Sequence, residues 1–144
     1  MKTIHDPLIK SGNKVGVPYH FDKITRTPNS LDAHRLIRWA LPLDKQVKVC
    51  DALFLAYWRD GKDVGGHTLL TEIAEAVGMD RHSIAIDLHT NKDGEKILAE
   101  ARQAQDKGIT GVPTFIINHK FGISGAQSAP VLAEVIRKIA MQRA

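Results

Sequence analysis

A single cysteine, Cys50, limits the redox chemistry available to this chain of 144 residues. One cysteine cannot form an intramolecular disulfide, a Cys-x-x-Cys redox pair or a multi-cysteine zinc site. Cys50 falls in the middle of an expected helix, on its apolar stripe, so we expect a small buried side chain rather than a reactive thiol. We therefore predict no catalytic cysteine within these residues.

Seven histidines raise the question of a metal site. Two pairs, His5 with His20 and His82 with His89, lack the His-x-x-x-His spacing and the convergent carboxylate of zinc enzymes. His34 is expected to be a polar residue at the edge of a helix. No metal site is predicted.

The composition is that of one soluble globular domain, with 43% hydrophobic and 25% charged residues. The 20 Lys and Arg residues are interleaved with 16 Asp and Glu residues and form no basic tract, so we predict no nucleic-acid partner. No apolar run approaches the roughly 18 residues that a membrane span needs, nor does one follow the first residues as in a signal peptide. A cytoplasmic protein without a membrane partner is predicted.

Turn-forming residues and hydrophobic periodicity divide the chain into three parts. Residues 1–28 are expected to be an extended arm with at most one strand, over Val15 to Phe21, and no helix. Residues 29–108 are expected to form a helical domain. Residues 109–144 are expected to hold a β-hairpin, Thr114 to Asn118 with Phe121 to Ile123, and a final helix, Ser128 to Met141.

Five helices are expected in the middle part, each with its own start or stop signal. Asn29 or Ser30 caps the first, which Pro42 ends. Asp44 caps the second, which ends at Gly61 and carries an apolar stripe of Val47, Cys50, Phe54, Tyr57 and Trp58. The other three are expected at His67 to Val77, from Asp80, and at Glu95 to Lys107.

Several segments together resemble the DsbA family of thioredoxin-fold proteins, in its FrnE-like branch. The closing half of that domain is similar to GITGVPTFIIN at Gly108–Asn118 and FGISGAQ at Phe121–Gln127. The helical insertion of the branch is similar to RTPNSLDAHRLIRWA at Arg26–Ala40 and ALFLAYWRDG at Ala52–Gly61. The resemblance implies a partial, thioredoxin-like α/β fold: a mostly α-helical insertion with a C-terminal β-hairpin and helix.

The resemblance also implies a substrate-binding loop at Val112, Pro113 and Thr114. Val112–Pro113 would be the cis-proline bond of the fold, and Val112 would offer its backbone to an extended peptide or thiol ligand. An ordinary trans proline opening an edge strand is the alternative. The family's Cys-x-x-Cys pair and first strands are expected to precede residue 1, so the chain is not expected to be redox-competent alone.

Without those strands the edge of Thr114 to Asn118 needs a partner. We expect a homodimer through this edge, or a separate chain that supplies the missing half. Two alternatives stay open for function. One is the glutathione transferase kappa and 2-hydroxychromene-2-carboxylate isomerase branch, with glutathione as its ligand, although Ser124–Gln127 fits the FrnE-like ending better. The other is a noncatalytic helical dimerisation or adaptor module. Apart from glutathione in the first alternative, no cofactor is expected.

Overall fold

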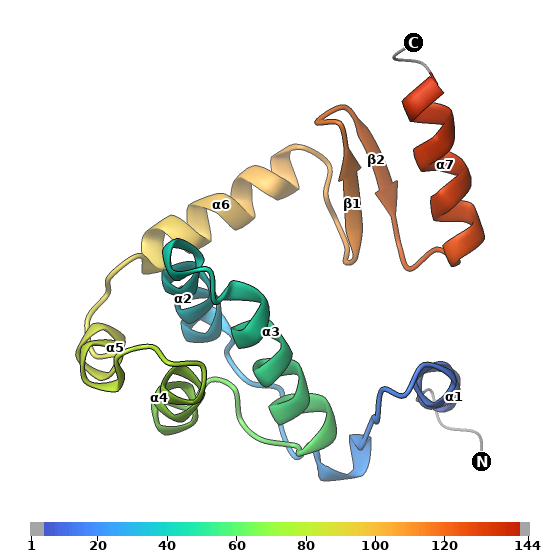
Figure 1. The fold of residues 1–144 in the computed structure, drawn as a ribbon. Helices are drawn as coiled ribbons and strands as arrows, with labels where there is room; N and C mark the ends of the chain where they lie inside the picture. Colours follow the sequence, from blue (N-terminus) through green and yellow to red (C-terminus); the bar gives the residue numbers. More distant parts are fainter. Residues whose placement is uncertain (1–4, 142–144) are drawn as a thin grey trace. The chain divides into compact units, whose positions relative to one another are not determined.

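The computed structural model describes residues 5–141, and the chain divides into two compact units. Unit 1 covers Met1–Ile97 and unit 2 covers Leu98–Ala144. Unit 1 is helical, and unit 2 holds both strands (Figure 1). Each unit is described by itself below.

The N-terminal segment contains a helix, α1 (Asp6–Lys14), where the sequence predicted an extended arm. The prediction treated Pro7 as a turn former, but Pro7 occupies the first turn of α1, where proline costs no hydrogen bond. The expected strand from Val15 is also wrong. The amide of Val17 donates to the carbonyl of Gly12 at 2.9 Å, so the chain folds back on α1 and then forms a short 3₁₀ helix, η1 (Phe21–Lys23).

Two helical segments follow, and both were predicted. They are α2 (Leu31–Ala40), extended by the 3₁₀ turn η2 (Leu41–Leu43), and α3 (Gln46–Phe54), continued by the π-helical turn η3 (Leu55–Arg59). Asn29 accepts a hydrogen bond from the amide of Leu31 at 3.0 Å. Asp44 does not cap α3, because its φ of 54° places it in the turn before Lys45.

The remaining helices of unit 1 begin and end near the predicted residues. They are α4 (His67–Ala76), α5 (Arg81–Leu88) and the start of α6 (Gly94–Asp106). The Asp80 carboxylate caps α5 by accepting from the amide of Ser83 at 2.5 Å. Gly78 follows α4 with a φ of 79°, a conformation that glycine adopts without strain.

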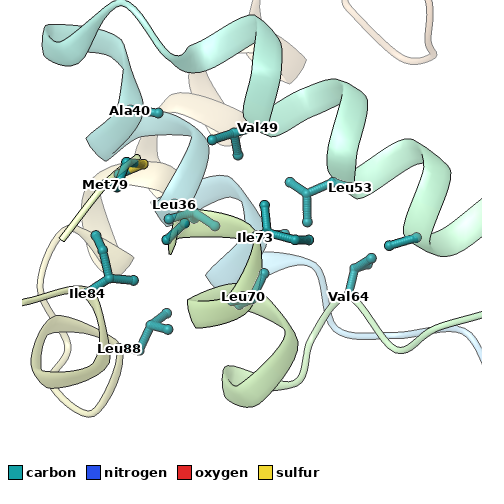
Figure 2. Close-up of a cluster of buried hydrophobic side chains, with 13 residues drawn as sticks. Leu36, Ala40, Val49, Leu53, Val64, Leu70, Ile73, Met79, Ile84 and Leu88 are labelled. Carbon is teal, nitrogen blue, oxygen red and sulfur yellow. The ribbon is translucent and has the colours of Figure 1, made fainter. Parts of the chain in front are cut away.

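The core of unit 1 lies where α2, α3, α4 and α5 meet (Figure 2). Leu36, Val49 and Leu70 are its largest fully buried side chains. The predicted stripe of α3 was wrong, since the helix buries Val49 and Leu53 while Val47 and Phe54 stay 73% and 62% exposed. Both sides of α3 carry apolar residues, and packing against α2 and α4 determines which side is buried.

Unit 2 contains the end of α6, the strands β1 (Thr114–Ile117) and β2 (Phe121–Ser124), and helix α7 (Ala129–Met141). The strands pair antiparallel, with Thr114 opposite Ser124 and Ile117 opposite Phe121. Asn118 and His119 both have positive φ, at 56° and 57°, in the connecting turn. The predicted hairpin, final helix and α/β fold class are confirmed.

Candidate functional site

The segment between α6 and β1 holds the three residues predicted to bind substrate. Gly108, with a φ of 80°, ends α6, and the amide of Ile109 still donates to the carbonyl of Ala104 at 3.0 Å. The chain then leaves the helix and enters β1 at Thr114, with a cis peptide bond between Val112 and Pro113. We call Gly111–Thr114 the proline loop.

Two hydrogen bonds fix the end of the proline loop on the hairpin. The Thr114 hydroxyl donates to the carbonyl of Gly111 at 2.7 Å, which closes the turn. The amide of Gly125 donates to the carbonyl of Pro113 at 2.8 Å, just beyond the last residue pair of the sheet. The carbonyl of Pro113 is therefore occupied.

Val112 is almost fully open to solvent, in a loop where Gly111 and Pro113 are exposed too. Its side chain is 92% exposed. Among residues 5–141, neither its amide nor its carbonyl has a hydrogen-bond partner. The sheet in this described part has only two strands, so the edge of β1 away from β2 carries unpaired backbone groups. The loop can accept an extended peptide segment through the backbone of Val112, and the edge of β1 can accept a further strand.

The side of the hairpin toward α7 is incompletely filled. A shallow groove of about 300 Å³ lies between Ile117 and Asn118 of the hairpin and Ile136, Ile139 and Ala140 of α7. Ile139 is the one buried hydrophobic side chain in the described part of unit 2, and Ile116 remains 57% exposed. The hairpin therefore presents apolar surface as well as an open edge.

Cys50 is placed mid-helix in α3, as predicted, and is half-buried. Burial, together with the negative charge of Asp51, raises the pKa of the Cys50 thiol. A thiol of raised pKa is a poor nucleophile at neutral pH, because the thiolate is the reactive form. The structure therefore gives Cys50 no feature of a redox-active cysteine.

Arg35 is a residue whose role the sequence missed. No pattern in the sequence indicated its burial, yet it is only 3% exposed. Its guanidinium donates to Asp32 at 2.7 Å and to four backbone carbonyls around the end of α5, those of Asp87, Leu88, Thr90 and Lys92. Arg35 thus fastens α2 to the end of α5.

Asp32 extends this contact to α4. Its second carboxylate oxygen lies 2.8 Å from Nε2 of His67. Burial acts to raise the pKa of Asp32, but the hydrogen bonds from Arg35 and His67 outweigh burial and hold the pKa below its usual value. The ring of His67 also makes an edge contact with His89, at 5.1 Å between centroids.

Among the histidines considered as metal ligands, His5 and His89 make ring contacts. His5 stacks on Phe21, with ring centroids 4.1 Å apart. His34, as expected, is an exposed residue of α2. In residues 5–141 no three His, Cys, Asp or Glu side chains are grouped to bind a metal ion. Over the same residues, no helix has the length and hydropathy to cross a membrane.

Comparisons with known proteins agree with this fold. Residues 1–137 match the model of the DSBA-like thioredoxin domain. An uncharacterized protein of Bacillus subtilis, YwbO, is 30% identical over 126 residues, which are 85% of this chain and 62% of that protein. The chain therefore spans about three fifths of the length of this relative.

Two solved structures share the fold. A probable DsbA oxidoreductase from Streptomyces coelicolor superposes with a TM-score of 0.86 at 26% identity, over 97% of this chain and 60% of that one. A 2-hydroxychromene-2-carboxylate isomerase gives 0.80 at 19% identity, over 95% and 66% of the two chains. With its helical unit, hairpin and proline loop, the chain belongs to the family of DSBA-like thioredoxin domains.

Proposed function

We propose that this chain forms the helical and C-terminal parts of a FrnE-like thiol-disulfide oxidoreductase, in which the proline loop binds the substrate. Val112, 92% exposed and with free backbone groups in the described structure, is the observation that carries the proposal. An extended substrate segment would pair with the backbone groups of Val112, in the loop that precedes β1.

The redox step needs two cysteines, a low-pKa thiolate that attacks and a second thiol that resolves the mixed disulfide. These 144 residues contain one cysteine, whose pKa is raised. We therefore propose that the Cys-x-x-Cys pair is supplied by a polypeptide segment outside these 144 residues. In an insulin-reduction assay the 144-residue chain should be inactive; activity that disappears in Cys50→Ala would mean that Cys50 reacts across two chains.

Substrate binding can be tested separately from catalysis. The probe is the reduced insulin B chain, a flexible peptide with thiols, labelled for fluorescence anisotropy. Val112→Pro removes the exposed amide and should weaken binding about tenfold, since backbone bonds supply the affinity in strand addition. Val112→Ala keeps the amide and serves as the matched control. Equal binding by the two variants would contradict a role for the Val112 amide.

For the open edge of β1 we propose pairing with a second copy of the chain, which would cover an edge that isolated sheets seldom leave free. Light scattering of the purified chain should then give twice the mass of one chain. Ile116→Lys, which places a charge on the exposed face of β1, should shift the mass toward the monomer. A monomeric parent chain would instead favour a separate polypeptide at this edge.

The similarity to 2-hydroxychromene-2-carboxylate isomerase supports a second proposal only at the level of the fold. In that case the chain would bind glutathione rather than an extended peptide. Calorimetric titration of the chain with glutathione distinguishes the two proposals. Saturable binding would favour the isomerase-like hypothesis, and the absence of binding heat would reject it.

A further inference from the structure

Unit 1 has a groove on the side of α3 away from the core. Val17, Pro18 and Tyr19 form one wall, and residues of α3 and η3 form the other: Asp51, Phe54, Leu55, Trp58 and Arg59. Its volume is about 460 Å³, within the range of sites for small organic molecules. We propose that this groove binds a small organic cation with an aromatic or apolar body.

The aromatic walls are held in place while leaving the groove open. Trp58 makes edge contacts with Tyr19 and Tyr57, at 5.6 and 4.7 Å between ring centroids. Phe54 lies one turn earlier and is 62% exposed. The π-helical turn η3 sets where Trp58 emerges, and such turns recur at functional sites. Trp58, which the sequence placed on the apolar stripe of α3, lines this groove.

The charges in the groove favour a cation. Arg59 is already bound by Asp60, which accepts from its Nε and Nη2 at 2.7 and 2.8 Å. Asp51 has no hydrogen bond or ion pair in the described part of the chain, so its carboxylate is the uncompensated charge of the lining. Lys23 and Lys62 act on Asp60 and do not line the groove. Aromatic faces beside a carboxylate attract cations.

This site is separate from the proposed function and is tested by calorimetry with three ligands of one shape on the full chain. They are 2-phenylethylammonium, 2-phenylethanol and 3-phenylpropanoate. The ammonium ion should bind at least about threefold more tightly than the alcohol, as expected for a cation beside aromatic rings, and the carboxylate least tightly. Asp51→Asn should abolish the preference for the cation while leaving the affinity for the alcohol unchanged, which also shows that the groove is intact.

Asp106→Asn, an exposed change at the end of α6, is the matched control and should leave the preference unchanged. Four results would overturn the proposal. They are no heat with any of the three ligands at millimolar concentration, a cation preference that survives Asp51→Asn, a Phe-Lys peptide that binds more tightly than the ammonium ion, and a dimer that Phe54→Ala converts to monomer. The last two would assign the groove to a polypeptide or a second copy.

Discussion

The two units of the chain differ in how much of their apolar surface they bury for themselves. Unit 1 encloses a cluster of 13 buried hydrophobic residues between four helices (Figure 2). Unit 2 buries the side chain of Ile139 and leaves Phe115, Ile116 and Phe121 partly open, among its described residues. A two-stranded hairpin is marginally stable by itself. Unit 1 is therefore stabilised from within, whereas unit 2 leaves apolar surface for the further polypeptide that we propose at its hairpin.

Arg35 offers the largest test of the internal stability of unit 1. Arg35→Ala leaves Asp32 and several carbonyls near the end of α5 without their buried donor, and it should lower the free energy of unfolding by about 3–5 kcal/mol. Arg81→Ala, in α5, is the control and should cost less than about 1 kcal/mol, because its ion pair with Glu75 is more than half exposed on both sides. Urea denaturation measures the free energy of unfolding of both variants. Equal losses would show that Arg35 stabilises unit 1 no more than a surface arginine does.

Matched truncations in the two units test how deeply each unit buries its apolar side chains. Leu70→Ala opens a cavity in the core of unit 1, where Leu70 is 0% exposed, and should cost about 2–5 kcal/mol. Ile136→Ala in α7, where the side chain is 52% exposed, should cost less than about 1 kcal/mol in the monomeric chain. If Ile136→Ala lowered the free energy of unfolding more than Leu70→Ala, unit 2 would have a buried core of its own, contrary to this expectation.

A smaller effect is expected at the cap of α5. Asp80→Ala removes the carboxylate that accepts from the amide of Ser83, at a cost of about 1 kcal/mol. Asp80→Asn keeps an acceptor and should retain most of the stability. Thermal unfolding followed by circular dichroism compares the three proteins, and an unchanged melting temperature in Asp80→Ala would refute the capping role.

The smallest expected effect is the pH dependence that Asp32 contributes. Because its folded-state pKa is lowered, the carboxylate binds protons less readily in the folded than in the unfolded chain. Its contribution is therefore complete above the unfolded pKa of about 4 and is lost as pH falls through the lower folded value. The stability of Asp32→Asn should fall less steeply below pH 4 than that of the parent chain. Parallel pH profiles would contradict this.

The sequence predicted most helices of unit 1 and the hairpin of unit 2 because their signals are local. Asp80 and Gly78 mark helix ends through their own backbone and side-chain chemistry, and a hydrophobic period needs no knowledge of the partner. The missed helix α1 begins at a proline that turns and helix starts both accept. A local signal therefore misleads where two kinds of local structure, here a turn and a helix start, share the same residue.

The buried face of α3 was predicted wrongly, and the burial of Arg35 was not predicted, for a different reason. Apolar residues lie around most of α3, so its orientation depends on α2 and α4, and Arg35 is buried by carbonyls more than 50 residues away in sequence. Such tertiary choices leave no local pattern. The residues of the proline loop were named through family resemblance, and the structure adds that Val112 is 92% exposed.

Hydrogen exchange on the purified chain measures the local stability of each unit separately. At low micromolar concentration, amides of α2, α3 and α4 should exchange ~100-fold more slowly than those of β1, β2 and α7, because local stability follows buried contacts. At higher concentration, protection of β1 should rise if a second copy covers its edge. Equal protection of both units at every concentration would contradict the account, since unit 2 would then be stable without a partner.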